Sequence, residues 1–145
     1  MKTSPSTFKL KPKTKEDLEN LIKAELAQGG NGCDLNHIDT SIITDFSFLF
    51  LGSLFCGDIS RWDVSNVESM IWMFTKSEFN GDISAWNASS LMADADMFLY
   101  SKMAKVLNVE SPSFEQVKRH FLGLRLEENL QAVSSRQGQA SKVRL

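Results

Sequence analysis

The residues best suited to nucleophilic chemistry in this 145-residue sequence are Cys33, Cys56, His37 and His120. A thiol beside an imidazole can form a nucleophile–base pair, so His37 with Cys33 or Cys56 is the dyad to consider. Alignment of the internal repeats described below puts Cys33 at a glycine position and His37 at a variable position. We therefore expect no enzyme activity, and two free, partly buried thiols.

Metal and phosphate sites are the other chemistry that the residue types suggest. Asp34, Asn36 and Asp39 carry the oxygen ligands that calcium prefers, but the segment lacks the glycine and the terminal glutamate of an EF-hand loop. The glycine-rich segment 29–32 is not followed by the Lys-Ser/Thr of a phosphate-binding loop. We expect no metal ion and no cofactor.

A repeat of 24 residues determines where these side chains lie. Residues 55–67 read Phe-Cys-Gly-Asp-Ile-Ser-Arg-Trp-Asp-Val-Ser-Asn-Val, and residues 79–91 read Phe-Asn-Gly-Asp-Ile-Ser-Ala-Trp-Asn-Ala-Ser-Ser-Leu. A weaker copy begins at Asp34. Three phenylalanines keep the same spacing, Phe50, Phe74 and Phe98. A period of 24 lies in the range of leucine-rich repeats, where each unit supplies a short strand and a helical return.

The apolar spacing within each unit predicts the local structure. It favours short parallel strands over three segments, 35–40, 59–64 and 83–88. The apolar stripe in residues 67–74, after the capping residues Ser65-Asn66, predicts a two-turn helix. Gly57 and Gly81 stand at the corner before a strand, where positive φ is expected. We predict an α/β repeat fold, a short leucine-rich-repeat-like solenoid of about three 24-residue coils with N- and C-terminal capping helices. The Met, Trp and Phe residues of the coils are expected to form its core.

The ends of such a stack need covers, because one coil cannot bury its own apolar face. At the N-terminal end, Thr14 is expected to cap an amphipathic helix that stops at Gly29-Gly30. Near the other end, Asp94 and Asp96 replace apolar residues of the preceding unit, which predicts the end of the stack.

The C-terminal helix is expected to start at Ser111-Pro112, or at Ser113 with Gln116 as a capping box. The predicted boundaries are a flexible basic N-terminus (1–13), an N-terminal capping helix (14–30), a three-coil solenoid (31–103), a C-terminal helical cap (104–133) and a flexible tail (134–145).

The repeat units resemble a known family. The strings Phe79-Asn-Gly-Asp-Ile-Ser-x-Trp-Asn and Trp62-Asp-Val-Ser-Asn-Val, with the later Met73-Phe74, are similar to the BspA-like leucine-rich-repeat family over residues 11–100. The resemblance implies a bacterial binding or adhesion module without catalytic residues, often one displayed on a cell surface. This chain departs from that pattern in having few repeats, no visible signal sequence and a degenerate third unit.

Composition and charge narrow the class of partner. The net charge is −2, and the lysines near the start have no interleaved aromatic residues, so nucleic-acid binding is not expected. No apolar run approaches the roughly 18 residues that span a bilayer. We expect a cytoplasmic protein without membrane association, or a cell-surface location if the chain is a fragment.

The predicted strands would place a polar patch on one solvent-facing sheet, since adjacent strands lie about 4.8 Å apart. Repeat proteins commonly bind partners through such surfaces. An alternative of equal weight is that the aspartates only cap turns or keep the sheet soluble. The candidate partner-binding residues are His37, Asp39, Arg61, Asp63, Ser65 and Asn87.

The function expected from these observations is non-catalytic protein–protein binding, through this face or through the C-terminal helix, which could also form a homodimer. Small size favours a bacterial or mobile-element-encoded binder or inhibitor of a host protein complex. The alternatives are a fragment of a BspA-like surface adhesin and, from another class, a thiol-dependent enzyme.

Overall fold

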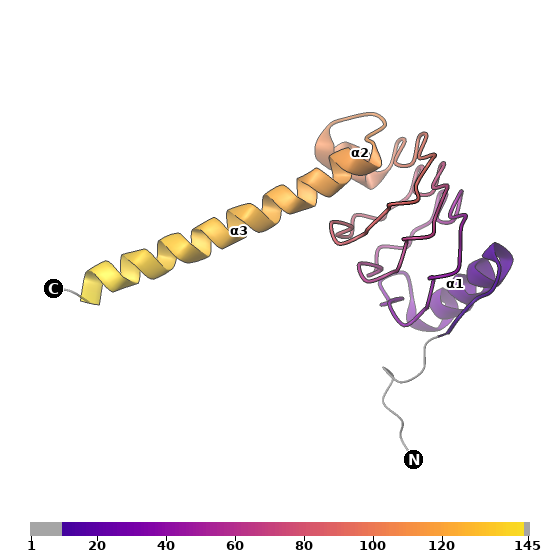
Figure 1. The fold of residues 1–145 in the computed structure, drawn as a ribbon, viewed down its shortest axis with the longest axis horizontal. Helices are drawn as coiled ribbons and strands as arrows, with labels where there is room; N and C mark the ends of the chain where they lie inside the picture. Colours follow the sequence, from indigo (N-terminus) through magenta and orange to yellow (C-terminus); the bar gives the residue numbers. More distant parts are fainter. Residues whose placement is uncertain (1–9, 144–145) are drawn as a thin grey trace, which may run out of the picture.

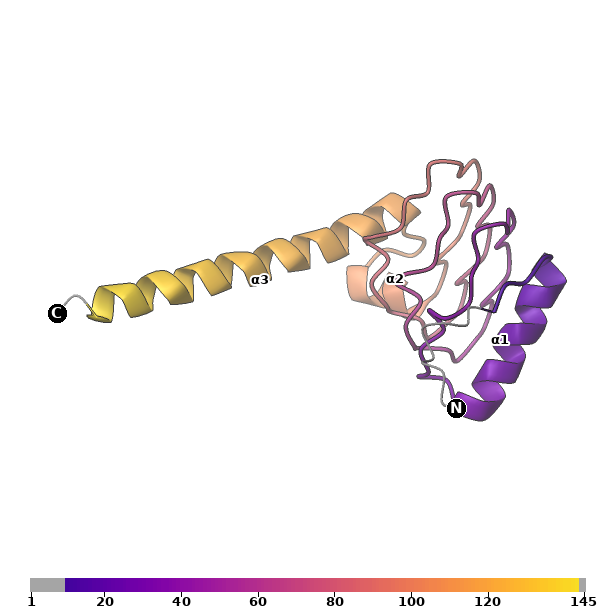
Figure 2. The ribbon, with the colours of Figure 1, turned by 60° about the horizontal axis from the view of Figure 1, so that its bottom comes forward.

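Helix α1 (Lys15–Gly29) lies across one end of the repeats in the computed structural model, which describes residues 10–143 and side chains as far as residue 136 (Figures 1 and 2). Thr14 caps it as predicted: the Thr14 hydroxyl accepts the Asp17 N–H, and the Asp17 carboxylate accepts the Thr14 N–H. Gly30 ends the helix with φ of 79°. Leu18 and Ile22 are buried against the repeats.

The three repeats that follow (31–54, 55–78 and 79–101) lie side by side and contain very little strand. Single parallel bridges join Asp34 to Asp58, and Ser69 to both Asp45 and Ala93. The predicted short strands and the predicted two-turn helices are wrong, because the described residues between α1 and the next helix form turns and isolated bridges.

Local hydrogen bonds explain why the strands do not form. Asp34, Asp58 and Asp82 each accept, at 2.8 Å, the backbone N–H of the residue two positions later. A turn closed in this way uses an N–H that a strand would donate to its neighbour. The aspartate at the start of each unit therefore breaks the extended chain just where the strand was expected.

Where helices were predicted, backbone N–H groups donate to the neighbouring repeat instead. The N–H groups of Phe46, Phe48 and Phe50 donate to carbonyls of the next repeat at 2.8, 3.0 and 2.8 Å, whereas those of Leu49 and Leu51 donate three residues back. An α-helix would need every N–H for its own carbonyls. Positive φ recurs every 24 residues and also stops helix propagation; the positions are Phe48, Trp72 and Asp96, then Gly52, Lys76 and Tyr100.

The core is a set of stacked aromatic rings. Phe74 lies between Phe50 and Phe98, with ring centroids 5.5 and 5.1 Å away, as the 24-residue spacing implies. Trp62 and Trp86 are buried, and each indole N–H donates to a carbonyl of the preceding repeat, at 2.8 and 3.0 Å. The prediction that all Met, Trp and Phe residues of the repeats are core is wrong at three exposed positions, Phe48, Trp72 and Met92.

The glycines at the corners serve a purpose other than the predicted one. Neither Gly57 nor Gly81 has positive φ. Instead, a Cβ atom on Gly57 would lie 1.9 Å from the Cys33 carbonyl oxygen, and one on Gly81 would lie 2.7 Å from the Phe79 ring. These positions need glycine because the neighbouring repeat and ring approach the backbone so closely.

Two helices close the other end. The short helix α2 (Lys102–Leu107), which the sequence reading missed, is capped by the buried Ser101 and ends at Asn108 in the left-handed region. Helix α3 (Phe114–Val143) begins at the second of the two predicted starts, since Ser113 and Gln116 form the reciprocal bonds of a capping box.

The first two turns of α3 cover the third repeat. The Phe114 ring stacks on Trp86 at 6.5 Å, and Lys118 Nζ donates to the Trp86 carbonyl at 2.8 Å. Asp94 and Asp96, which interrupt the repeat pattern, accept bonds from the Phe114 N–H and the Ser111 hydroxyl. The two aspartates therefore hold the segment that starts α3.

Beyond these turns α3 runs away from the domain as a single helix (Figure 1). Residues 134–143, predicted as a flexible tail, are helical; they include the good helix formers Arg136, Gln137, Ala140 and Lys142 and no proline. The described chain is a compact domain with three helices, little strand content and a buried aromatic core, from which α3 projects.

Candidate functional site

The predicted polar face exists as neighbouring turns. Thr40 Oγ1 donates to the Asp63 carbonyl at 2.8 Å, and Asn66 Nδ2 donates to the Ser41 carbonyl at 2.6 Å. The turn over 39–41 therefore lies directly beside the turn over 63–66. The structure thus brings Asp39, Asp63 and Ser65 together.

The aspartates of this face close turns within their own repeats. Asp39 Oδ1 accepts the Ser41 N–H at 3.0 Å, and Asp63 Oδ1 accepts the Ser65 N–H at 3.0 Å and the Ser65 hydroxyl at 2.6 Å. This turn-closing role, one of the two alternatives, is sufficient to explain an aspartate at each of these positions. Binding of a protein by the face stays a prediction.

The other three predicted residues have separate surroundings. His37 Nε2 lies 3.1 Å from the Glu25 carboxylate of α1, which turns His37 toward the N-terminal helix. Arg61 is exposed, and its main-chain N–H donates to Asn36 Oδ1 at 2.8 Å. Asn87 is also exposed.

The Cys33 thiol does not have the lowered pKa of an activated nucleophile. Cys33 and Cys56 are both free, but Cys56 is exposed, so the prediction that both thiols are partly buried is wrong for Cys56. Burial raises the pKa of the Cys33 thiol, which favours the protonated form, whereas a nucleophilic cysteine needs its pKa lowered. The nearby imidazole of His37 faces Glu25.

A polar cleft of about 430 Å³ lies where α3 leaves the domain. Arg125 of α3 reaches back across it, with Nη2 3.0 Å from Asp82 Oδ2. Hydrogen bonds from Ser60 hold the pKa of Asp58 below its ordinary value. For Asp82, burial raises the pKa, but bonds from Ser84 and Arg125 outweigh it and lower the pKa. The cleft is lined by Gly32, Cys56, Gly57, Asp58, Ser60, Gly81, Asp82 and Arg125.

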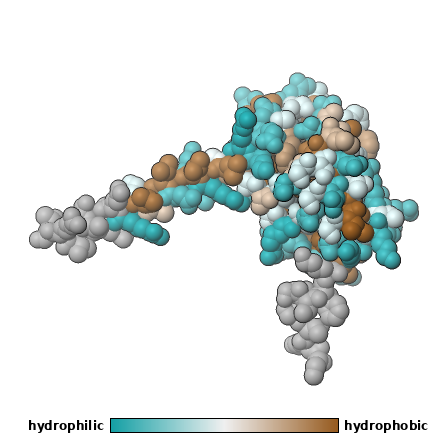
Figure 3. Space-filling view, in the orientation of Figure 1, coloured by the Kyte–Doolittle hydropathy of each residue, from teal (hydrophilic) through white to brown (hydrophobic). Residues whose placement is uncertain are grey.

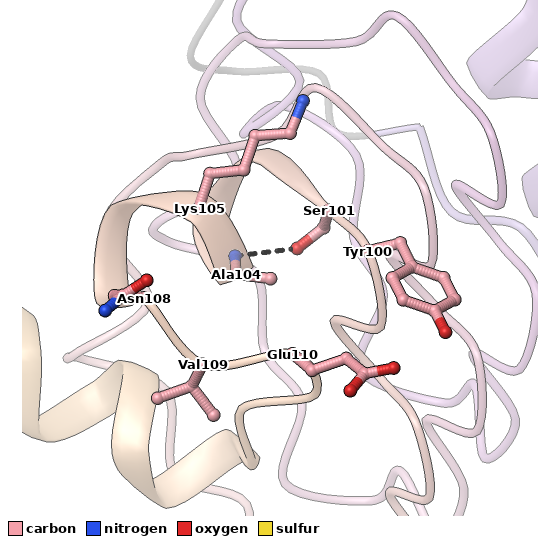
Figure 4. Close-up of a pocket in the computed structure, with 7 residues that line it drawn as sticks. All are labelled: Tyr100, Ser101, Ala104, Lys105, Asn108, Val109 and Glu110. Atoms are coloured by element: carbon pink, nitrogen blue, oxygen red, sulfur yellow. Dashed lines mark hydrogen bonds between the residues drawn. The ribbon is translucent and has the colours of Figure 1, made fainter.

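A second hollow of about 300 Å³ lies beside α2 (Figure 4). Its buried hydroxyl belongs to Ser101 and accepts the Ala104 N–H at 3.1 Å, so it is used as a helix cap. A hydrogen bond to Glu110 raises the pKa of Tyr100, which keeps the phenol protonated. The lining residues are Tyr100, Ser101, Ala104, Lys105, Asn108, Val109 and Glu110.

Within residues 10–143, no group of three or more His, Cys, Asp and Glu side chains is placed to hold a metal ion. None of the three helices in the same range combines the length and apolar character needed to cross a membrane.

The second predicted binding surface is the C-terminal helix, α3. Leu126 and Leu130 are 63% and 68% exposed, and Leu122 and Val133 are exposed on the same helix. Figure 3 shows apolar side chains along one side of the projecting helix and hydrophilic ones along the other. The sequence marks these residues as apolar, but only the structure shows that no described part of the domain covers them.

The described residues form repeated turns around a stacked aromatic core, with helices at both ends. A family model described as "Mycoplasma protein of unknown function, DUF285" matches residues 17–128, which is most of the chain. The chain therefore belongs to the DUF285 family, which is leucine-rich-repeat-like. No curated protein and no solved structure matches it.

Proposed function

We propose that this chain is a non-catalytic protein-binding module in which BspA-like repeats form a short leucine-rich-repeat-like solenoid and α3 presents the binding surface. The observation that carries the proposal is the row of exposed apolar residues on α3, Leu122, Leu126, Leu130 and Val133. Large exposed apolar patches on soluble domains commonly mark interaction sites.

The projecting part of α3 also needs stabilisation that the domain does not supply. Among the described side chains of α3 beyond Lys118, Arg125 reaches the repeats through its ion pair with Asp82. Helices in proteins gain most of their stability from the packing of an apolar face, whereas short isolated helices are marginal in water. A protein surface packed on the leucines would supply that missing stabilisation.

The proposal is tested by affinity capture from a cell lysate with the full tagged chain, quantified by mass spectrometry. Wild type is compared with Leu126→Glu/Leu130→Glu, and Leu124→Glu serves as the matched control because Leu124 is exposed on α3 but lies outside this row. Leucine and glutamate have similar helix propensities, so the helix itself is preserved. We expect protein partners that are lost only in the double variant.

A further variant separates the two surfaces. Arg61→Glu/Asn87→Lys changes the polar face at two exposed side chains while leaving the main-chain bond of Arg61 intact. Partners lost in this variant and kept by the α3 variants would move the binding surface to the repeats. Turnover of a substrate that disappears with Cys33→Ala/Cys56→Ser in the folded protein would instead support the thiol-enzyme alternative.

A further inference from the structure

Six positions of α3 form a stripe with a regular spacing. Positions 119, 123, 126, 130, 133 and 137 are separated by 4, 3, 4, 3 and 4 residues. At 100° per residue, all six fall within about 80° around the helix axis. This set, called the α3 stripe below, consists of Arg119, Gly123, Leu126, Leu130, Val133 and Gln137.

The stripe points away from the domain that carries the helix. The residues of α3 that pack on the third repeat are Phe114, Val117 and Phe121. Their mean direction lies about 165° around the axis from that of the stripe, by the same helical geometry. The stripe is therefore a separate surface and not a continuation of the face that caps the repeats.

Charged residues of the exposed segment avoid the stripe between its two ends. The helical positions of Arg125, Glu127, Glu128 and Arg136 all fall outside it. The apolar part of the stripe thus lies between the charged Arg119 at one end and position 137, a glutamine in the sequence, at the other. A spacing of 4 and 3 with apolar residues is the pattern by which two helices pack along a seam.

The order of residues along the stripe is symmetric about position 128. A two-fold axis there places Leu126 opposite Leu130 of a second copy, and the small Gly123 opposite the branched Val133. Arg119 then stands opposite position 137. An isologous interface requires this self-complementarity, and a partner of different sequence does not.

A parallel arrangement fits less well. It would set Arg119 against the same arginine of the second copy, which brings like charges together. It would also set Gly123 against itself, leaving a gap where neither chain has a side chain. Charge and packing both favour the antiparallel arrangement.

We propose that the α3 stripe binds a second copy of this chain, forming an antiparallel two-helix pair with its two-fold axis beside position 128. The proposal rests on the proposed function, because it names the partner of that same surface. Since the domain sits at the N-terminal end of α3 (Figure 1), the two domains lie at opposite ends of the shared helices. The interface closes on itself, so assembly stops at two chains.

The test is sedimentation velocity on the full chain. Wild type is expected to sediment with twice the 16.3 kDa mass of one chain at micromolar concentration. Leu126→Glu/Leu130→Glu should weaken dimerisation on the order of 100-fold or more, since it removes two buried leucines from each chain. Leu124→Glu should leave the dimer intact, because this exposed leucine lies on the side away from the stripe.

The orientation is tested by disulfide trapping in a Cys33→Ala/Cys56→Ser background whose dimerisation is first verified by sedimentation. Single variants Gly123→Cys and Val133→Cys are mixed and oxidised. A Cβ at Gly123 meets nothing within 4 Å, so the cysteine fits there. The antiparallel pair gives disulfides between the two different variants, whereas a parallel pair gives them within each variant.

Three results would overturn the inference: a monomeric wild type, equal loss of dimer in the Leu124→Glu control, or disulfides formed mainly within each single variant. A monomer that still captures other proteins from a lysate through Leu126 and Leu130 would refute the second copy as partner and leave the proposed function standing. A monomer that captures nothing would remove both.

Discussion

Replacing Gly57 by alanine should be among the most damaging single changes in the repeats. The new Cβ would lie 1.9 Å from the Cys33 carbonyl oxygen and 2.7 Å from the Phe55 ring. Because the first contact is with backbone, a side-chain rotation cannot relieve it, and the corner must move away from the first repeat.

Such a movement breaks the hydrogen bonds that join the two repeats at this corner. They run from the Cys56 N–H to the Asn31 carbonyl at 2.8 Å, from Asp58 to Cys33 at 3.3 Å, and from Leu35 to Asp58 at 3.0 Å. At about 0.5–1.5 kcal/mol net for each of the three bonds, the loss is about 1.5–4.5 kcal/mol. A domain of ordinary stability has about 5–15 kcal/mol, so this is a large fraction.

The assay is urea unfolding followed by tryptophan fluorescence, with Gly32→Ala as the matched control. A Cβ at Gly32 meets nothing within 4 Å, so the control should change the unfolding free energy by less than about 0.5 kcal/mol. A loss below about 1 kcal/mol for Gly57→Ala, or an equal loss in both variants, would refute the argument from close backbone approach.

Three further predictions use the same unfolding assay. Trp62→Ala should lower the free energy of unfolding by about 3–5 kcal/mol because the residue is 3% exposed. Trp62→Phe should lower it by less, about 1–3 kcal/mol, because the Leu35 carbonyl loses its indole donor. Losses below about 1 kcal/mol in both variants would mean that the indole is not buried. The bond from Ser60 lowers the pKa of Asp58 in the folded state, so this stabilisation is present above the unfolded pKa and lost as pH falls through the folded one. The urea concentration at the unfolding midpoint should therefore fall when the pH is lowered below about 4, and it should fall less steeply in Asp58→Asn than in wild type. Parallel curves of midpoint against pH for the two proteins would contradict this prediction. Gly123→Ala should raise stability by about 0.5–1 kcal/mol, since it improves a helix where there is space for the methyl group, and a decrease would show that glycine is required there.

The elements predicted correctly depend on local chemistry. Thr14 and Asp17 specify the start of α1 by two reciprocal bonds within four residues, and Ser113 with Gln116 does the same for α3. The phenylalanine column follows from strict periodicity, because residues 24 apart occupy equivalent places in successive repeats. These features need no knowledge of the rest of the chain.

The errors arise where distant backbone groups compete. The apolar residues Met70, Met73 and Phe74 fit one face of a helix, and all three are buried, but the N–H groups of Met70 and Phe74 donate to the third repeat. Apolar periodicity reports which side chains are buried and not where backbone N–H groups donate. For the same reason, the exposure of Leu126 and Leu130 could not be read from the sequence, since it depends on how the start of α3 docks.

The second repeat accepts from the first and donates to the third through equivalent groups. Phe46, Phe48 and Phe50 donate to residues 69, 71 and 73, and Met70, Trp72 and Phe74 donate to residues 93, 95 and 97. If the 24 residues of the second repeat were duplicated in tandem, the new repeat would meet the same backbone donors and acceptors as the original one. The domain can therefore lengthen by one repeat at a time during evolution while α1 and α3 still cover its two ends. The number of repeats would then set the distance between α1 and α3.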